Sequence, residues 1–342
     1  MEIGMYAPTH GIGLRDDENF FAQSIPAIEM QPVRIAQMAE RIGMHSMWFP
    51  DHVCMPISST SGHVANESRT RAYEPSHNLV DAAVAMGAVA AGTSRIRLGT
   101  SVLIAPYRGP LNDARQFASV DVLSAGRLIL GVGAGWLEEE FDALGLDYEA
   151  RGAQTEECIE IYKRSWTDDV VAFHGDHYNF DNLSMDPKPV QKPRPPIVFG
   201  SVVPAGARRA ARLCDGFYPI FLDPGADPHR FAPLQDIIRG ELDAAAKDPG
   251  EFSMLCISSA QITDADHAES QRSPRKICTG TGEQILEDLQ RFADAGYSLV
   301  VFIFDCPSGE MAELREQVER IGAEVMPAAR EIKVAGEWQK TV

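Results

Sequence analysis

Residues 95–141 read RIRLGTSVLIAPYRGPLNDARQFASVDVLSAGRLILGVGAGWLEEEF and decide the fold of this chain. They contain two β-type apolar runs, residues 96–104 and 127–136, with a helical segment between them. A strand, a helix and a second strand within about forty residues have the size of one βαβ unit. Both runs end in small residues or glycines, so the backbone there could approach a flat ligand without Cβ atoms in the way. If the unit repeats along the chain, the ends of its strands locate a binding site.

The same alternation of strand and helix occurs eight times along the chain. The expected strands are residues 2–7, 46–49, 96–104, 128–132, 197–199, 216–220, 252–262 and 299–304. The expected helices are residues 32–42, 79–91, 110–122, 153–166, 205–213, 233–246, 283–295 and 310–325. Alternating elements with strands rich in Val, Ile and Leu predict a parallel sheet. Because the first turn, residues 7–11, lacks the G-x-G-x-x-G of an open dinucleotide-binding sheet, we expect an α/β fold closed into a (β/α)8 TIM barrel.

Residues 174–196 interrupt this alternation. The segment holds one glycine and five prolines, a composition typical of loops, so we expect an insertion there. His174 and His177 lie in a predicted hairpin within it, and since no nearby third ligand stands out we do not expect a metal site. Residues 1–330 are expected to form one barrel domain. Residues 331–342 are expected to be a polar tail that is mobile at its end.

The composition restricts the class of partner. A net charge of −18 and a pI near 4.9 argue against nucleic acid or an anionic membrane surface, because both bind clustered Lys and Arg. The longest apolar runs have the length of strands, which disfavours a membrane span. The six cysteines are scattered without a C-x-x-C pair, which disfavours a disulfide framework and a structural zinc site. The N-terminus lacks a signal-peptide pattern, so we expect a soluble cytoplasmic protein that acts on a small molecule.

In a TIM barrel the active site lies at the C-terminal ends of the strands. The second predicted strand is followed by Asp51 and His52, where a carboxylate could orient and charge an imidazole for proton transfer. In the alternative interpretation, Asp51 caps the following segment and His52 makes one structural hydrogen bond. The barrel topology alone favours neither interpretation.

Two further strand ends carry candidate residues. After the fifth strand, Gly200 and Ser201 precede a helix with three arginines, and small residues before a helix N-terminus suit a phosphate. The alternative there is a solvated basic helix face. After the fourth strand, residues 138–140 are three glutamates that begin a helix, and we interpret them mainly as charges favoured by the helix dipole. The flat side chain of Trp136 could line a pocket for a ring-shaped ligand, although a tryptophan more often packs in the hydrophobic core.

Motifs spread over most of the chain carry a family resemblance. They are LGTSVL (98–103), DVLSAGR (121–127), GVGAGW (131–136), YEARG (148–152), PKPVQKP (187–193) and RRAAR (208–212). With these motifs in this order, the chain resembles the bacterial luciferase-like oxidoreductases from about residue 2 to 330. It resembles more closely the branch that depends on coenzyme F420.

The resemblance implies a (β/α)8 barrel with an insertion and a deazaflavin cofactor bound at strand ends three to five. It implies that the cofactor is bound by Thr100, Ser101, Val102, Gly133, Ala134, Gly135, Gly200, Ser201 and Val202. It also implies a non-prolyl cis peptide at Ser101–Val102, behind the central ring of the cofactor. Asp51 and His52 match the family's catalytic Asp-His pair, which makes His52 the expected proton donor or acceptor. Ser201 replaces the second glycine of the family's phosphate-binding Gly-Gly.

Two departures from the F420-dependent sugar-phosphate dehydrogenases bear on the substrate. Trp136 stands where the resemblance places a catalytic glutamate, and Pro56 stands where it places a tryptophan. Both differences argue against a sugar phosphate and for a more apolar substrate. The hypothesised substrate pocket consists of Met47, Cys54, Met55, Tyr107 and Trp136.

The leading hypothesis is therefore hydride transfer between F420 and a small organic substrate, with His52 handling the proton. The first alternative is an FMN-dependent monooxygenase that uses a reduced-flavin peroxide and needs a separate flavin reductase. The second is a non-catalytic flavin-binding barrel, which the intact Asp51 and His52 disfavour. We expect a homodimer, the commonest homo-oligomer. The sequence leaves open which substrate is used and in which direction the hydride moves.

Overall fold

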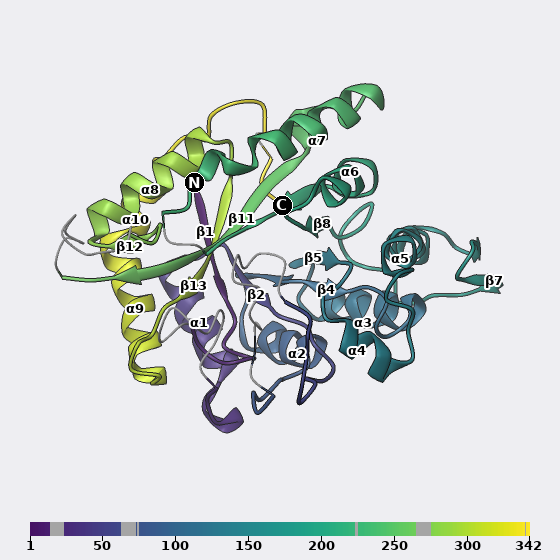
Figure 1. Cartoon of the computed structure of the whole chain (residues 1–342), viewed down its shortest axis with the longest axis horizontal. Helices are drawn as coiled ribbons and strands as arrows, with labels where there is room; N and C mark the ends of the chain where they lie inside the picture. Colours follow the sequence, from purple (N-terminus) through teal and green to yellow (C-terminus); the bar gives the residue numbers. More distant parts are fainter. Residues whose placement is uncertain (14–23, 63–72, 74, 223–224, 265–274, 339) are drawn as a thin grey trace.

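A computed structural model gives the structure of the chain and describes residues 1–13, 24–62, 73, 75–222, 225–264, 275–338 and 340–342. Its centre is a parallel barrel (Figure 1). The barrel strands are β1 (Glu2–Tyr6), β2 (Ser46–Phe49), β3 (Arg97–Thr100) with β4 (Leu103–Ile104), β5 (Leu128–Gly133), β8 (Ile197–Gly200), β9 (Gly216–Tyr218) with β10 (Ile220–Phe221), β11 (Ser253–Ile262) and β13 (Leu299–Phe304). Strand β13 pairs with β1 and β11, and β11 pairs with β9, so the sheet closes. The predicted (β/α)8 barrel is confirmed.

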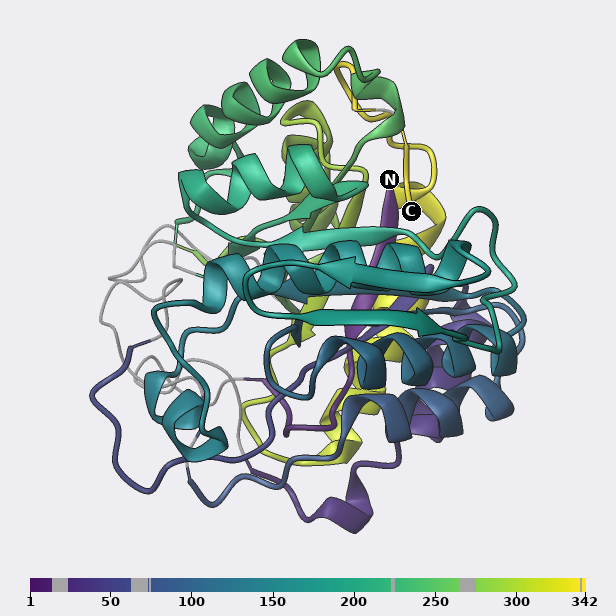
Figure 2. The same ribbon diagram turned by 90° about the vertical axis from the view of Figure 1, so that its right-hand side faces the viewer.

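Helices surround this barrel (Figures 1 and 2). They are α1 (Pro32–Ile42), α2 (Ala82–Gly92), α3 (Pro110–Leu123), α5 (Arg151–Thr167), α6 (Pro204–Leu213), α7 (Ala232–Ala244), α8 (Gly282–Asp294) and α9 (Met311–Glu324). Their ends follow local chemistry, since Asp81 caps α2 and Thr281 with Gln284 forms a capping box at α8. A short helix, α4 (Glu138–Leu144), lies between β5 and α5. It was not among the helices expected from the sequence. It contributes to the site described below.

The third barrel strand is broken where a continuous strand was expected. Between β3 and β4 the Ser101–Val102 peptide bond is cis, as the resemblance implies. The Val102 side chain lies between two glycines: a Cβ on Gly133 would come 2.5 Å from one Val102 methyl, and a Cβ on Gly200 would come 2.7 Å from the other. These glycines are needed to accommodate Val102. From the sequence we had explained these small residues only as positions where the backbone can approach a ligand closely.

The predicted insertion is present as a hairpin. Strands β6 (Val171–His174) and β7 (Asn179–Leu183) pair antiparallel, starting slightly before the expected segment. The hairpin extends outward beyond α5 (Figures 1 and 2). His174 bonds Asp181 at the exposed surface. Among the described residues, no group of three or more His, Cys, Asp and Glu side chains is placed to hold a metal ion.

The C-terminal residues pack against the barrel, which differs from the mobile tail that we expected. Trp338 is buried, with its ring 5.9 Å from that of Phe252. Ser298 donates to the carbonyl of Lys340, and Val342 joins the apolar cluster of the barrel strands. The expectation considered the polar composition of the tail and overlooked its apolar residues, among them Trp338 and Val342. The tail thus covers the end of the barrel opposite the strands' C-terminal ends.

In the described part of the chain, no helix combines the length and the apolar character that crossing a bilayer requires.

Candidate active site

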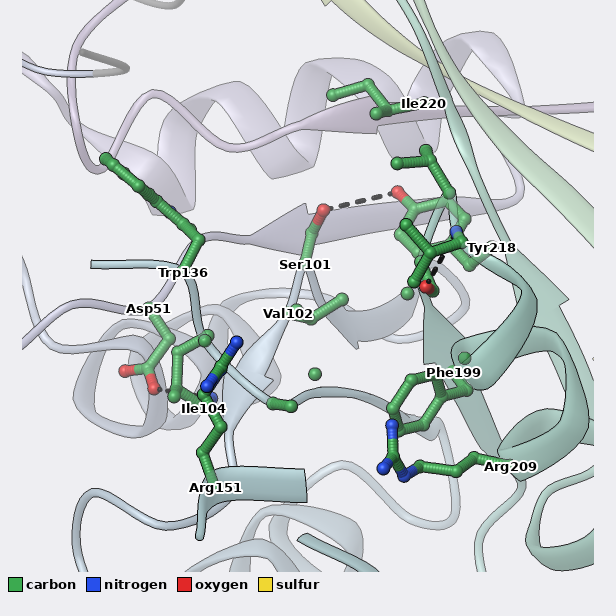
Figure 3. Close-up of a pocket in the computed structure, with 18 of the residues that line it drawn as sticks. Asp51, Ser101, Val102, Ile104, Trp136, Arg151, Phe199, Arg209, Tyr218 and Ile220 are labelled. Atoms are coloured by element: carbon green, nitrogen blue, oxygen red, sulfur yellow. Dashed lines mark hydrogen bonds between the residues drawn. The ribbon is translucent and has the colours of Figure 1, made fainter. Parts of the chain in front are cut away.

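A cavity of about 460 Å³ opens at the C-terminal ends of the barrel strands. Eleven residues singled out from the sequence lie on its wall: Asp51, His52, Ser101, Val102, Gly133, Ala134, Gly135, Trp136, Gly200, Ser201 and Val202. Figure 3 shows Val102 near the centre, with Trp136 and Asp51 to one side and Phe199 and Tyr218 to the other. The cavity thus lies where the fold predicts an active site. Its size and its mixture of apolar and polar walls are typical of a site for a small molecule or cofactor.

Several residues expected at the site lie outside this wall. Thr100 is buried and donates its hydroxyl hydrogen to the carbonyl of Gly131 at 2.7 Å, so it ties β3 to β5. Met47 faces the surrounding helices because side chains alternate along β2 and the neighbouring Trp48 faces the barrel interior. Cys54, Met55 and Tyr107 also lie off the cavity wall.

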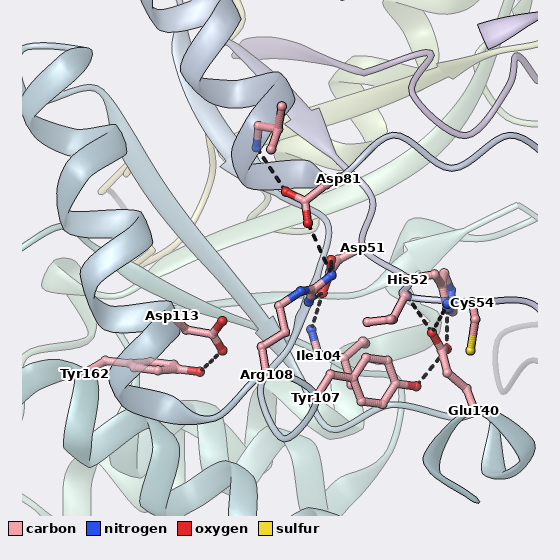
Figure 4. Close-up of polar contacts among 12 residues, drawn as sticks. Asp51, His52, Cys54, Asp81, Ile104, Tyr107, Arg108, Asp113, Glu140 and Tyr162 are labelled. Carbon is pink, nitrogen blue, oxygen red and sulfur yellow. Dashed lines mark hydrogen bonds and ion pairs between the residues drawn. The ribbon is translucent and has the colours of Figure 1, made fainter. Parts of the chain in front are cut away.

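Glu140, not Asp51, is the carboxylate that holds His52. The Glu140 Oε2 atom lies 2.7 Å from His52 Nδ1 (Figure 4). The same oxygen accepts a hydrogen bond from the Tyr107 hydroxyl at 2.9 Å. Of the two interpretations of this pair, the one in which Asp51 orients His52 is therefore wrong, because the Asp51 carboxylate is bound by Arg108. Glu140 belongs to the glutamates that we had interpreted as helix-dipole charges.

Asp51 is instead fixed by Arg108. The two Arg108 amino groups donate to the two Asp51 oxygens at 2.6 and 2.7 Å, a bidentate pair. Asp51 Oδ2 also accepts the backbone N–H of Ile104 at 3.2 Å, and Arg108 lies 3.8 Å from Asp81 at the start of α2 (Figure 4). With its charge compensated in this way, Asp51 connects the end of β2 to β4 and α3.

The protonation states of the buried groups follow from these contacts. Burial alone would raise the pKa of Glu140, but hydrogen bonds from His52 and from the backbone of Cys54 and Val53 outweigh it and lower that pKa. Burial and the nearby Glu140 charge raise the pKa of Tyr107 above its usual range. Glu140 is therefore a carboxylate at neutral pH, and Tyr107 is a neutral donor to it.

Aromatic side chains form the wall next to His52. The ring of Tyr73 lies edge-on to His52 at 5.3 Å and to His10 at 5.4 Å, and the Trp136 ring lies 6.1 Å from His52. His10 is 2 % exposed, and within the described part of the chain neither of its ring nitrogens has a hydrogen-bond partner. Burial and the nearby His52 lower the pKa of His10 well below its usual range, so His10 is neutral.

The hydroxyl groups of Tyr6, Tyr73, Ser101 and Tyr218 form another part of the cavity. The Tyr6 hydroxyl lies 3.2 Å from that of Tyr73 and donates to the carbonyl of Ser101 at 3.4 Å. The Ser101 hydroxyl lies 3.3 Å from the Tyr218 hydroxyl. Burial raises the pKa values of Tyr6 and Tyr218. These groups therefore remain neutral and can offer hydrogen bonds to the polar edge of a bound ring.

The remaining part of the cavity wall is cationic. Helix α6 begins there without a capping side chain, and Ser201 accepts the N–H of Val203 at 3.2 Å. Arg209, one of the three arginines predicted on this helix, lines the cavity and is paired with Glu156 at 2.8 Å. Arg208 and Arg212 pair with Glu241 and Glu156 and are absent from the wall.

A second arginine on this wall was not singled out from the sequence. Arg151 begins α5, lines the cavity, and stacks with its guanidinium 3.6 Å from the centroid of the Tyr148 ring. Figure 3 shows both arginines below Val102, with Arg151 next to Ile104 and Arg209 next to Phe199. An uncapped helix N-terminus with two arginines is suited to an anion, even in a protein whose net charge is −18.

Comparisons with known proteins agree with this geometry. The family model described as luciferase-like monooxygenase matches residues 1–331. An FMNH(2)-dependent dimethylsulfone monooxygenase of Pseudomonas fluorescens is 31% identical, with 90% of this chain and 89% of that protein aligned. An uncharacterized protein of Mycobacterium tuberculosis is 30% identical, with 70% of this chain and 81% of that protein aligned.

Solved structures share the fold at low sequence identity. A monooxygenase from Streptomyces bottropensis superposes with a TM-score of 0.73 and 18% identity. An F420-dependent secondary alcohol dehydrogenase, in complex with an F420-acetone adduct, superposes with a TM-score of 0.71 and 19% identity. Each comparison covers 96% of this chain and 99% of the other.

Proposed function

The chain belongs to the luciferase-like monooxygenase family, and on that premise we propose that it is a coenzyme F420-dependent oxidoreductase acting on a small, rather apolar organic substrate. The observation that carries the proposal is that His52 lies on the cavity wall and is held by the buried Glu140. It places an imidazole with a fixed partner beside a cavity large enough for a cofactor ring. Family members are oxidoreductases or monooxygenases that use a flavin or a deazaflavin, and the choice of F420 is part of the proposal.

The residues of the cavity fit such a cofactor. Val102 would support one face of its ring system, since this side chain enters the cavity from the break between β3 and β4. The N-terminus of α6, Arg151 and Arg209 would hold its phosphate and anionic tail. Bound F420 supplies hydride chemistry, because it carries carbon at the ring position where a flavin carries nitrogen.

His52 supplies the proton that must accompany a hydride. Its Nδ1 atom is engaged by Glu140, so Nε2 is the nitrogen left to exchange a proton with the substrate. Reduction of a carbonyl group would take a proton from Nε2 of the imidazolium form of His52 to the carbonyl oxygen and leave the neutral Nδ1–H form. Oxidation of an alcohol would start from that neutral form and return the proton to Nε2. The low-polarity surroundings of Trp136, Ile104 and Ile220 favour an apolar substrate body.

An FMN-dependent monooxygenase is the second candidate function. The 31% identity to the Pseudomonas fluorescens enzyme over 90% of this chain favours it. Such an enzyme would use reduced FMN and oxygen and would need a flavin reductase. We favour F420 because the motif Thr100-Ser101-Val102 resembles its branch, and because an imidazole held by a carboxylate suits proton transfer coupled to hydride transfer.

Titration of the purified protein tests the choice of cofactor. We would follow the fluorescence of F420 and of FMN, each in oxidised and reduced form, as the protein is added. The proposal predicts a micromolar Kd for F420 and binding of FMN at least tenfold weaker. Micromolar binding of FMN together with no binding of F420 would exclude the proposal and support the monooxygenase.

A further inference from the structure

We propose that Glu140 is the positioning residue that fixes the tautomer of His52, keeping the proton on Nδ1 and presenting Nε2 to the cavity. The inference rests on the proposed function in one respect, namely that His52 exchanges a proton with the substrate. It assigns to α4 a purpose that a (β/α)8 barrel does not require. This short helix carries Glu140 to the mouth of the barrel.

The Glu140 carboxylate accepts four hydrogen bonds. His52 Nδ1 and the Tyr107 hydroxyl bind Oε2 at 2.7 and 2.9 Å. The backbone N–H groups of Val53 and Cys54 bind Oε1 at 2.7 and 3.1 Å. A carboxylate has about four acceptor positions, so all of them are used. A fully buried carboxylate with four donors has one stable orientation, since any rotation would leave a buried group without its partner.

These hydrogen bonds connect three successive strand ends of the barrel. His52 follows β2, Tyr107 follows β4, and Glu140 lies in the helix after β5. The same carboxylate therefore holds the imidazole and the backbone of the two residues after it. The segment that carries His52 cannot shift along the wall without breaking contacts to Glu140.

The chemistry of the acceptor decides which nitrogen carries the proton. Because Glu140 is ionised and can only accept, His52 Nδ1 must donate to it. The second donor, Tyr107, stays protonated and cannot compete as a base. The opposite tautomer would place the Nδ1 lone pair against a carboxylate oxygen at 2.7 Å, an unfavourable contact.

The other ionisable groups that face His52 do not replace Glu140. His10 and Tyr73 contact the imidazole on its other side and are neutral. Asp51 is adjacent in sequence but is bound by Arg108. Cys54 faces Glu140, and burial and the Glu140 charge raise the pKa of its thiol. Glu140 is thus the ionised group in direct contact with the imidazole among the described residues.

Glu140→Gln tests the proposal, with Glu139→Gln as the matched control. Glutamine keeps the shape of the side chain but offers an amide N–H to His52, which favours the opposite tautomer. Glu139 precedes it in the same helix and binds the backbone of Thr60 and Ser61, without contact to His52. The tautomer is read from the ¹⁵N NMR signals of His52, assigned by their loss in His52→Gln.

We expect the Nδ1–H tautomer in the wild-type protein and in Glu139→Gln, and loss of that single tautomer in Glu140→Gln. Turnover of reduced F420 with a panel of small ketones should fall at least tenfold in Glu140→Gln alone, while the Kd for F420 changes less than twofold. The proposal is overturned by an Nε2–H tautomer in the wild-type protein, a measurement that needs no variant. It is equally overturned if Glu140→Gln matches Glu139→Gln in tautomer and turnover.

These readouts separate this inference from the proposed cofactor. The tautomer is measured without any cofactor, so an Nδ1–H signal in a protein that fails to bind F420 would reject the cofactor and leave the positioning role intact. Conversely, F420 binding with a freely exchanging His52 tautomer would retain the cofactor and reject the role of Glu140.

Discussion

Adding a single methyl group at Gly133 should disturb both the barrel and its cavity. In Gly133→Ala the new Cβ would lie 2.5 Å from a methyl group of Val102, where ordinary contacts are 3.4–4 Å. The new Cβ would thus be about 1 Å closer to the methyl group than an ordinary contact allows. The β-branched Val102 side chain cannot rotate away, because its other methyl group faces Gly200. The open direction is into the cavity. Val102 should therefore move toward the position that the cofactor ring would occupy.

The size of the effect follows from overpacking in a well-packed site, which costs about 1–3 kcal/mol. With an unfolding entropy of about 2.1 cal/mol/K per residue, or roughly 0.7 kcal/mol/K for this chain, Tm should fall by about 1–4 °C. Displacement of Val102 into the cavity should weaken F420 binding at least tenfold, or about 1.4 kcal/mol. Thermal unfolding and fluorescence titration measure the two effects on the same samples.

A double-mutant cycle isolates the contact. Val102→Ala removes both methyl groups, so the pair Gly133→Ala and Val102→Ala should show a coupling energy of about 1–3 kcal/mol in stability. Gly131→Ala on the same strand is the matched control, because its Cβ would meet the carbonyl oxygen of Thr100 at 2.0 Å, a clash that Val102→Ala cannot relieve. The reasoning is refuted if the effects at 133 and 102 add within about 0.5 kcal/mol.

Two more predictions concern His52 on the cavity wall and Asp113, a buried residue of α3 that accepts a hydrogen bond from Tyr162. His52→Ala should leave the Kd for F420 nearly unchanged and lower kcat by roughly two orders of magnitude or more, and unchanged turnover would remove His52 from the mechanism. Burial and the nearby Asp51 raise the pKa of Asp113 to about 7, so the native state keeps a proton that the unfolded state loses near pH 4. The free energy of unfolding should therefore fall by a few kcal/mol as pH rises from about 4 to 8, and less so in Asp113→Asn; equal pH slopes in urea unfolding would contradict this.

The fold was accessible from the sequence because its repeat is long and regular. Apolar strands and amphipathic helices alternate, and each observed barrel strand or helix lies within a few residues of its expected position. The break at Ser101–Val102 was not visible in the sequence pattern, since the β-type run 96–104 has the composition of one continuous strand. The packing of Val102 against glycines from two other strands is a tertiary contact that a local pattern cannot contain.

The position of the site was predicted from the sequence, but the hydrogen-bond partners of its residues were predicted only in part. Strand ends place His52, Ser101 and Gly200 at one mouth of the barrel, because parallel strands point the same way. The partner of His52 was assigned to the adjacent Asp51, although the two side chains diverge, and it is Glu140, 88 residues away along the chain. The sequence did contain one indication that Glu140 is buried. The residue after it, Phe141, is apolar, and both residues are buried in α4.

The contributions of two arginines to the site were not predicted, for a related reason. Arg108 and Arg151 stand in loops or at a helix start, where a sequence pattern does not distinguish a solvated cation from one turned inward. Arg108 is bound to Asp51, and Arg151 stacks on Tyr148. The orientation of Arg108 depends on a partner that follows a different strand, whereas Arg151 stacks on a ring just before it in the chain.

The most direct test of the account is a crystal structure of the protein with bound F420. The account predicts the deazaflavin ring against Val102, its phosphate near the start of α6 and Arg209, and His52 Nε2 facing the open side of the ring while Nδ1 remains bonded to Glu140. A ring bound away from Val102, or a His52 turned from the cavity with its bond to Glu140 broken, would contradict it.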